Sequence, residues 1–304
     1  MSKIDFSGRV AIVTGAGGGM GRLHALALAE RGAKVVVNDL GGAVDGSGGS
    51  VGAAQKVADE IRAKGGQALA SGASVTDFDA VQAMVQQAID QWGRVDILVN
   101  NAGILRDKTF AKMDLADFRL VLDVHLMGAV HLTKAAWPHM VAQKYGRVMM
   151  TTSSTGLYGN FGQSNYGAAK LALVGLMQTL GLEGAKYNIR VNALAPTAAT
   201  RMTEDLLLPE TLAMLRPEAV VPAMLVLVSE DAPSRTTLCA GAGSYEAAHI
   251  TMTRGLHLGL THDTPERLLA ALEQVTDSAG QTIPQSGAEQ GAHEIKRFNV
   301  ECLA

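Results

Sequence analysis

Residues 9–21, RVAIVTGAGGGMG, join two patterns that together predict one local structure. The run begins with apolar, β-branched residues, which are typical of a buried strand. Glycines follow, and residues 20–31 are rich in alanine and leucine, which favours a helix. A glycine-rich turn between a strand and a helix lets an anionic group approach the backbone, because the helix start offers free N–H groups. We expect such contacts from Gly15, Gly19, Met20 and Gly21.

Outward from this stretch, apolar strand-like runs alternate with segments of helical periodicity. Further strands are expected at 33–39, 95–100, 147–152 and 189–194, and helices at 53–64, 77–92, 115–142 and 165–187. Because each strand is apolar throughout, helices must cover both faces of the sheet. The sequence therefore predicts an α/β fold with a Rossmann-type, doubly wound parallel sheet, in a single domain with a C-terminal extension.

The expected boundaries follow from where this alternation weakens. The domain is predicted over residues 1–255, with a lid at about 198–217, and the extension over 256–304. The extension shows one short helical pattern at 265–275 and then a polar segment. Pro138 is expected to bend or end the long helix at 115–142.

Composition excludes several classes of protein. The 304-residue chain is 47% hydrophobic and 18% charged, which is typical of a folded, globular protein. Its formal net charge of −3 offers no basic surface for nucleic acid. The sequence shows neither a signal peptide nor an apolar run of membrane-spanning length, so we expect a cytoplasmic protein. Two distant cysteines fit a reducing compartment, and the eight histidines show no metal-ligand spacing.

Asp39 ends the second predicted strand. A carboxylate at that position can accept hydrogen bonds from both hydroxyls of a ribose and repels a 2′-phosphate. Residues 16–19 and 40–50 contain no Arg or Lys that would pair with such a phosphate. These observations favour NAD over NADP as the cofactor. The alternative is that Asp39 only caps the turn before Gly41 and Gly42.

Ser153, Tyr166 and Lys170 are the strongest candidates for chemistry. Tyr166 and Lys170 lie one turn apart on the predicted helix 165–187, so their side chains share a face. A phenol is a weak base at neutral pH, but a nearby ammonium group and the charge of an oxidised nicotinamide lower its pKa. Tyr166 can then take a proton from an alcohol as hydride leaves, while Ser153 holds the substrate oxygen. The alternative is a surface tyrosine beside a snorkelling lysine.

These residues resemble the marks of the short-chain dehydrogenase/reductase family. The resemblance covers roughly residues 6–245 and follows the family's order: Thr14-Gly15-x-x-x-Gly19-x-Gly21, Asn100-Asn101-Ala102-Gly103, Ser153, Tyr166-x-x-x-Lys170 and Asn192-x-x-x-Pro196. It implies hydride transfer between a nicotinamide and a secondary alcohol or ketone. It further implies cofactor contacts from Asn101, Ala102, Gly103, Tyr166, Lys170, Pro196 and Thr200. A homodimer or homotetramer built on helices 115–142 and 165–187 is implied as well.

A closer resemblance is carried by residues 38–42, 102–107, 135–137 and 158–163. These segments are similar to the dehydrogenase domain of the peroxisomal multifunctional β-oxidation enzymes of the second type. The resemblance implies oxidation of (3R)-3-hydroxyacyl-CoA to 3-oxoacyl-CoA. A steroid 17β-alcohol or another bulky secondary alcohol or ketone is the alternative substrate. Two other interpretations stay open: a nucleotide-binding scaffold without turnover, and dehydratase or epimerase chemistry on the same fold.

Some positions depart from the wider family. His125 stands where most members have a catalytic asparagine, and the multifunctional group resembles this chain there, so His125 is a catalytic candidate that can preserve a helix kink. Ser74 stands where an aspartate usually meets the adenine and is kept as a cofactor contact. The residues expected to line a substrate pocket are Tyr158, Phe161 and, in the lid, Met202, although Met202 can equally pack the lid down.

Overall fold

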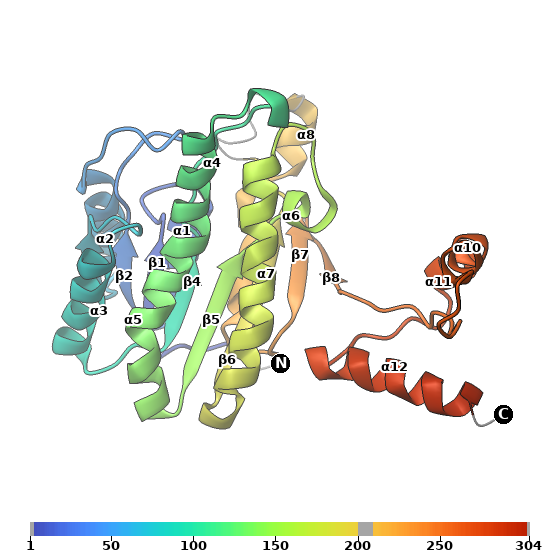
Figure 1. Ribbon diagram of the computed structural model, residues 1–304. Helices are drawn as coiled ribbons and strands as arrows, with labels where there is room; N and C mark the ends of the chain where they lie inside the picture. The colour runs from blue at the N-terminus through green and yellow to red at the C-terminus, as the bar shows by residue number, and fades with distance from the viewer. Residues whose placement is uncertain (1–2, 200–208, 303–304) are drawn as a thin grey trace. The chain divides into compact units, whose positions relative to one another are not determined.

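The computed structural model describes residues 3–199 and 209–302. The chain divides into two compact units, Met1–Ala248 and His249–Ala304, which are described separately (Figure 1). The first unit contains the sheet, and the second contains short helices. In the described residues, no helix is long and apolar enough to cross a membrane.

An eight-stranded sheet forms the centre of the first unit (Figure 1). The strands stand in the order β3-β2-β1-β4-β5-β6-β7-β8, and all pairs are parallel except β7 with β8. The doubly wound parallel sheet predicted from the sequence is therefore confirmed. The strands are β1 Val10–Thr14, β2 Lys34–Asn38, β3 Ala68–Ser71, β4 Ile97–Asn100, β5 Gly146–Thr151, β6 Ile189–Pro196, β7 Thr237–Gly241 and β8 Ser244–Ala248.

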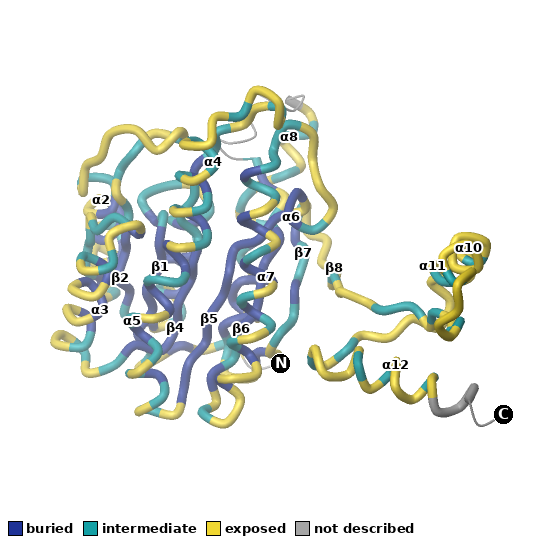
Figure 2. The backbone as a smooth tube through the Cα atoms, viewed as in Figure 1, coloured by how far each residue is buried: buried dark blue, intermediate teal, exposed yellow. Residues whose placement is uncertain are grey.

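Helices cover both faces of the sheet because alternate strand residues face opposite sides. On β1, Ala11 and Val13 pack with residues of α1, α2 and α9, whereas Val10 and Ile12 pack with residues of α3, α5 and α7. Figure 2 shows the central strands β2, β1, β4, β5 and β6 as the buried layer between these helices. The helices of this unit are α1 Gly19–Ala29, α2 Gly52–Ala63, α3 Phe78–Trp92, α4 Leu115–Leu122, α5 Gly128–Gln143, α6 Ser154–Tyr158, α7 Ser164–Gly184, α8 Pro209–Met214 and α9 Val221–Leu227.

The segment predicted as one helix over 115–142 contains a wider turn. Residues Asp123–Met127 form a π-helix between α4 and α5. A π turn adds a residue to the helical ladder, and such turns are frequent at functional sites. The sequence predicted that Pro138 would bend or end the long helix. In the structure it does not end the helix but lies inside α5. The helix continues past it because Ala136 and Met140, on either side, are packed into the buried core.

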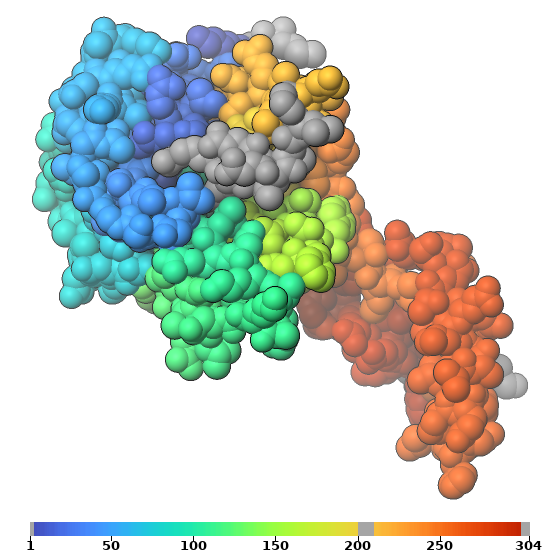
Figure 3. Space-filling view, turned by 90° about the horizontal axis from the view of Figure 1, so that it is seen from above, coloured from blue at the N-terminus to red at the C-terminus, as the bar shows by residue number. Residues whose placement is uncertain are grey.

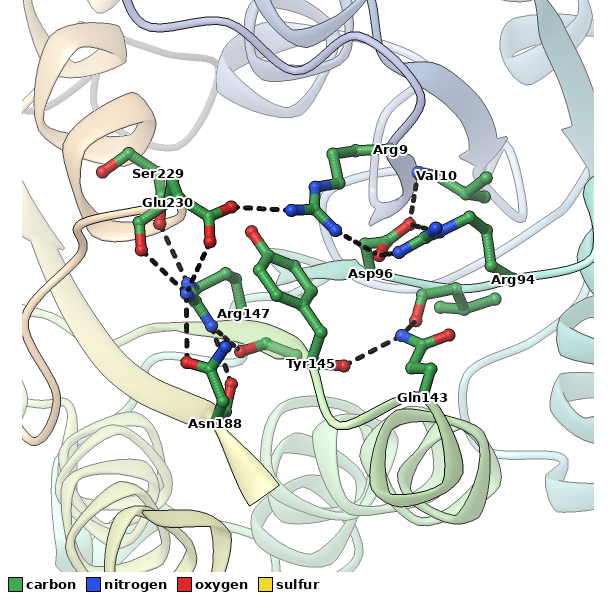
Figure 4. A network of polar contacts seen from close by, with 12 residues as sticks. Arg9, Val10, Arg94, Asp96, Gln143, Tyr145, Arg147, Asn188, Ser229 and Glu230 are labelled. Carbon is green, nitrogen blue, oxygen red and sulfur yellow. Dashed lines mark hydrogen bonds and ion pairs between the residues drawn. The ribbon is translucent and has the colours of Figure 1, made fainter. Parts of the chain in front are cut away.

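A network of charged side chains closes the amino edge of the sheet, where the strands begin (Figure 4). Arg147 of β5 is fully buried and donates hydrogen bonds to the carbonyl oxygens of Gly146, Asn188, Ser229 and Glu230. The ring of Tyr145 lies between the guanidinium groups of Arg9 and Arg147, whose central carbons are 3.7 and 4.2 Å from its centroid. Buried Asp96 accepts from the Val10 N–H at 2.9 Å. The network thus ties β1, β4, β5 and β6 together at their first residues.

The second unit consists of α10 Thr264–Ala270, α11 Leu272–Thr276 and α12 Gly287–Cys302. The short helix predicted at 265–275 is therefore two helices, and the polar segment after it contains a third. An antiparallel bridge joins Met252 to Thr282. None of the residues described in this unit is buried (Figure 2). Within its described part the unit therefore has no hydrophobic core of its own.

Candidate active site

The predicted site residues gather at the carboxyl edge of the sheet, where its parallel strands end. The strand order reverses between β1 and β4, and ligands of such sheets bind in the crevice at that point. The loops after β2 and β4 lie side by side on this edge (Figure 3), where the Leu105 N–H donates to Val44 O at 3.0 Å.

The glycine turn after β1 has the shape that a pyrophosphate requires. Gly15 and Gly19 have φ angles of +62° and +50°, which favour glycine. A Cβ on Gly21 would collide with the carbonyl oxygen of Gly15, so the inner side of the turn is tightly packed. On the outer side, a Cβ on Gly18 or Gly19 would meet nothing within 4 Å. The turn therefore fits an anionic ligand placed against the first N–H groups of α1.

The Asp39 carboxylate lies beside this turn at the end of β2. Its Oδ2 accepts from the Gly17 N–H at 2.8 Å, and its Oδ1 accepts from the Gly41 N–H at 2.6 Å. The second contact is the turn cap considered as the alternative, and the first fixes the carboxylate against the glycine turn. Each oxygen keeps a lone pair that a ribose hydroxyl can use. Arg22, at the start of α1, forms an ion pair with Glu60 at 2.6 Å.

The segment after β4 holds the end of β1 in place. Asn101 Nδ2 donates to Thr14 O at 3.0 Å, and the N–H groups of Asn101 and Ala102 donate to Thr14 Oγ1 at 3.0 and 3.1 Å. Gly21 also lies close to Asn101, because a Cβ on that glycine would stand 2.6 Å from Asn101 Nδ2. The Asn-Ala-Gly motif thus joins the end of β4 to the end of β1 and to the glycine turn that follows β1.

The other predicted cofactor contacts are spread around the same edge. Met20 is partly buried and packs on the core beneath the glycine turn. Ser74 follows β3, and its Oγ lies 2.8 Å from Thr76 Oγ1. Pro196 is the last residue of β6. Thr200 and the pocket candidate Met202 lie outside the described residues.

Helices α6 and α7 bring Ser153, Tyr166 and Lys170 together at the end of β5. Ser153 caps α6, and its Oγ accepts from the Thr155 N–H at 3.2 Å. The Ser153 hydroxyl also faces the Tyr166 phenol closely enough to lower the pKa of that phenol. Lys170 Nζ lies 5.4 Å from the centroid of the Tyr166 ring and donates to Thr151 O at 2.6 Å. Tyr166 and Lys170 therefore share the helix face that their spacing predicts.

Burial governs how these groups ionise in the protein by itself. Lys170 is only 3% exposed, and burial lowers the pKa of its ammonium group to about 7. Burial raises the pKa of the Tyr166 phenol, which the hydrogen bond with Ser153 opposes and the charge of Asp107 reinforces. The phenol pKa lowering expected from the sequence is thus not a property of these side chains alone. An oxidised nicotinamide bound beside the phenol would supply an additional positive charge that lowers this pKa.

His125, on the π turn, packs against the tyrosine. Its ring meets the Tyr166 ring edge to face, with centroids 5.2 Å apart at 90°. Nε2 lies 2.8 Å from Ile104 O and 3.1 Å from Ile104 N, whereas buried Nδ1 has no partner among the residues that the structure describes. A Cβ on Gly103 would collide with the His125 ring, so only glycine fits there. Burial, assisted by the Lys170 charge, holds the pKa of His125 well below its usual value, so the ring is neutral at neutral pH.

Comparison with known proteins then settles the family. The family described as short chain dehydrogenase matches residues 9–210 of this chain. The chain belongs to the short-chain dehydrogenase/reductase family. It is therefore an oxidoreductase of a family that uses NAD(P).

Two relatives and one solved structure place this dehydrogenase more closely. It is 50% identical over 276 residues to a short-chain type dehydrogenase/reductase of Mycobacterium tuberculosis, covering 90% of this chain and 96% of that protein. It is 48% identical over 278 residues to the peroxisomal hydratase-dehydrogenase-epimerase of Saccharomyces cerevisiae, covering 90% of this chain but 31% of that protein. The full-length peroxisomal multifunctional enzyme type 2 of Drosophila melanogaster matches with a TM-score of 0.80 and 36% identity, covering 96% of this chain and 50% of that chain. The dehydrogenase thus spans about a third to a half of these multifunctional proteins.

The two described pocket candidates of this dehydrogenase lie on the outer rim of the site. Tyr158 is 73% exposed and Phe161 is 88% exposed. Interaction with Cys239 of β7 raises the pKa of the Tyr158 phenol. An enclosed apolar pocket would shield such rings from water, so the structure does not place them in one. Their role as substrate contacts stays a prediction.

Three polar residues close to Tyr166 were not among the predicted site residues. Asp107 and Gln163 form a hydrogen bond of 2.6 Å. Asn165 is buried, donates to Arg106 O at 2.9 Å and accepts from the Tyr166 N–H at 2.7 Å. The available signal was their position, just after the Asn-Ala-Gly motif or just before Tyr166. Residue type alone does not separate them from other polar loop residues.

Proposed function

We propose that this dehydrogenase oxidises (3R)-3-hydroxyacyl-CoA to 3-oxoacyl-CoA with NAD as the hydride acceptor. The observation that carries the proposal is the gathering of Ser153, Tyr166 and Lys170 on the same sheet edge as the glycine turn and Asp39. The acyl-CoA substrate is supported by the similarity to multifunctional enzymes, one of which is named a hydratase-dehydrogenase-epimerase.

The proposed reaction removes a hydride from C3 of the substrate and a proton from its hydroxyl group. A bound oxidised nicotinamide supplies the hydride acceptor. Tyr166, as the phenolate, takes the hydroxyl proton, and Ser153 donates a hydrogen bond to the oxygen that becomes the carbonyl. In the reverse direction the Tyr166 phenol returns that proton to the carbonyl oxygen.

Lys170 sets the charge beside the phenol in this scheme. Its Nζ is fixed by the 2.6 Å hydrogen bond to Thr151 O, so it cannot swing away from the tyrosine without losing that bond. A positive charge 5.4 Å from the ring centroid favours the phenolate over the phenol. The hydroxyls of a bound nicotinamide ribose would give the ammonium group further acceptors and support its charged form.

The preference for NAD over NADP rests on Asp39. Its carboxylate is fixed beside the glycine turn by two backbone N–H groups and would repel a ribose 2′-phosphate. Residues 40–50 contain no Arg or Lys, and Arg22 is engaged by Glu60. The charges described around this position therefore favour a ribose with free hydroxyls.

We also propose that the dehydrogenase forms a dimer or tetramer through α4, α5 and α7. Large apolar side chains stay exposed on or beside these helices, among them Leu115, Met127, Leu171 and Leu182. Covering them with a second copy would remove apolar surface from water. Light scattering on a sizing column measures the mass directly, and a monomer at micromolar concentration would contradict the proposal.

The direct test is NADH formation from NAD with (3R)- and (3S)-3-hydroxyacyl-CoA, assayed in parallel with a steroid 17β-alcohol. We expect turnover of the 3R isomer and none of the 3S isomer. Activity on the steroid alone would overturn the acyl-CoA substrate but not hydride transfer. No turnover of any of the three would favour a scaffold, and a changed acyl chain without NADH would indicate dehydratase or epimerase chemistry.

A further inference from the structure

Two loops meet beside Tyr166 and contain a hydrogen-bonded pair for which the proposed reaction has no use. Residues 106–108 run along residues 162–165, and Gln163 Nε2 donates to Asp107 Oδ2 at 2.6 Å where they cross. We propose that Asp107 and Gln163 are positioning residues that hold the Ser153 hydroxyl in register with the Tyr166 phenol. The inference rests on the function proposed above for Ser153 and Tyr166.

Hydrogen bonds lead from this pair to the serine. Gln163 Oε1 accepts from Thr155 Oγ1 at 3.0 Å and from Asn160 Nδ2 at 3.0 Å. The Thr155 N–H in turn donates to Ser153 Oγ at 3.2 Å. Gln163 directly precedes α7, which carries Tyr166, and Thr155 lies in the first turn of α6, which Ser153 caps. One amide therefore joins the helix start that holds the serine to the helix start that holds the tyrosine.

The carboxylate of Asp107 decides which way that amide points. An ionised carboxylate only accepts hydrogen bonds, so it can bind the NH₂ end of Gln163 but not the carbonyl end. The carbonyl oxygen must then face Thr155 and Asn160, both of which donate to it. Reversing the amide would set a carbonyl against the carboxylate and an NH₂ group against the Asn160 NH₂. Asp107 thus selects the orientation that anchors Thr155.

The position of the Ser153 hydroxyl relative to the Tyr166 phenol determines how fast the proposed reaction can run. Ser153 and Tyr166 must both reach one substrate oxygen, and a displacement of about 1 Å can reduce a rate by about 100-fold. Thr155 is 9% exposed, and its hydroxyl is committed to Gln163. Loss of that anchor frees the first turn of α6 to shift the Ser153 hydroxyl. The pair therefore acts through Thr155 and Ser153, not by touching the substrate.

The groups around the Tyr166 phenol allow two effects on its pKa to be told apart: the charge of Asp107 and the position of the Ser153 hydroxyl. The groups that face Tyr166 are Lys170 from α7, neutral His125 from the π turn, the Ser153 hydroxyl and the Asp107 carboxylate. The charge of Asp107 raises the pKa of Tyr166, whereas the Ser153 hydrogen bond lowers it. Removing the charge and disturbing the serine therefore move the Tyr166 titration in opposite directions.

A carboxylate–amide exchange tests the pair kinetically. Asp107→Asn and Gln163→Glu each disturb the pairing, whereas D107N/Q163E restores one carboxylate and one amide, with the carboxylate introduced by Q163E still accepting from Thr155. With NAD and (3R)-3-hydroxybutyryl-CoA, we expect each single change to lower kcat by about tenfold with KM little changed, because the lost alignment acts in the transition state. The double variant should recover most of kcat. Asp231→Asn, an exposed carboxylate elsewhere, is the matched control.

A second measurement needs no substrate and so separates this inference from the proposed function. Thr155→Val removes the hydroxyl anchor without changing any charge. The phenolate absorbance of Tyr166, taken as the difference between each variant and its Tyr166→Phe partner, should then titrate at higher pH, and the same shift is expected in Ser153→Ala. Adding T155V to S153A should shift the titration no further.

The outcomes bear on the two proposals separately. A wild-type chain silent on every substrate contradicts the proposed function, and the titration still decides the inference. A Tyr166 titration that T155V leaves unchanged overturns the inference. So do exchange variants whose effects on kcat simply multiply, because independent effects mean that the two side chains are not paired.

Discussion

The two edges of the sheet use similar polar residues but differ in how completely those residues are bonded. At the amino edge, Arg147 is fully buried and donates to four backbone carbonyls (Figure 4). At the carboxyl edge, four buried atoms have no partner within the described part of the chain: Asn100 Oδ1, His125 Nδ1, Thr151 Oγ1 and Ser164 Oγ.

The difference separates stability from function. A buried polar atom without a partner costs about 1–3 kcal/mol, so a fold keeps such atoms only where something compensates. All four at the carboxyl edge lie on the strand ends, the π turn or the start of α7 around Lys170 and Tyr166. We therefore expect changes at the amino edge to alter unfolding and changes at the carboxyl edge to alter turnover.

The largest effect is expected from removing one oxygen atom at the carboxyl edge. Tyr166→Phe should reduce kcat by about 100- to 10,000-fold, the usual contribution of a general acid–base group. NADH binding and the thermal midpoint should stay close to those of the wild type, since the phenyl ring still packs on His125. Kinetics, NADH fluorescence and a melting curve check the three statements. Wild-type turnover in this variant would contradict the proposed mechanism.

A change at the amino edge should instead lower the free energy of unfolding and leave turnover unchanged. Arg147→Met leaves four carbonyl groups without their donor and removes one face of the Tyr145 stack. The free energy of unfolding in urea should fall by about 3–5 kcal/mol, as for other broken buried charge networks. The folded fraction should keep its kcat. Arg62→Met, at an exposed position of α2, is the control, and equal losses in both variants would remove the distinction between the edges.

Acid should weaken the helix that begins at the glycine turn. His24 of α1 is buried, its Nδ1 has no hydrogen-bond partner in the described part of the chain, and burial lowers its pKa from 6.5 to about 4. Between these values the unfolded chain binds more protons than the folded one, so stability falls as the pH decreases from about 6.5 to 4. The contribution is about 3 kcal/mol. Urea unfolding at several pH values should show a shallower decline in His24→Leu, and parallel declines would refute the assignment.

The smallest effect is expected from a change at Asp39, which lies at the carboxyl edge and is proposed to select NAD. Asp39→Asn keeps the shape of the side chain but removes its charge, so NAD affinity should fall by about tenfold, as for loss of a charged hydrogen bond. The discrimination against NADP should fall as well, because the repulsion of the 2′-phosphate is gone. Titration of both coenzymes measures this. Unchanged binding of both would leave Asp39 with only its turn-capping role.

The local patterns that predicted the fold are those that depend on neighbours in the sequence. The strand and glycine turn of residues 9–21 and the Tyr166–Lys170 spacing rest on periodicities of a few residues, and the structure has both. The antiparallel edge strand β8 was not predicted, because Ser244, Tyr245, Glu246 and Ala247 are all exposed and form no buried apolar run.

What the sequence could not predict depends on contacts between distant segments. The π turn at Asp123–Met127 lies between two helices of ordinary pattern, and Pro138 stays helical because of packing on both sides. The Asp107–Gln163 pair joins residues 56 positions apart. Neither residue type nor spacing reveals such a contact until the loops are placed side by side.

The most direct test of the account follows the hydride itself. The enzyme would be given NAD and either the 3R or the 3S 3-hydroxyacyl-CoA carrying deuterium at C3, and the NADH formed would be weighed by mass spectrometry. The account predicts deuterium in the NADH from the 3R substrate and none from the 3S substrate, with transfer slowed by about 100- to 10,000-fold in Tyr166→Phe. Unlabelled NADH from the 3R substrate, or labelled NADH from the Tyr166→Phe variant at the wild-type rate, would contradict it.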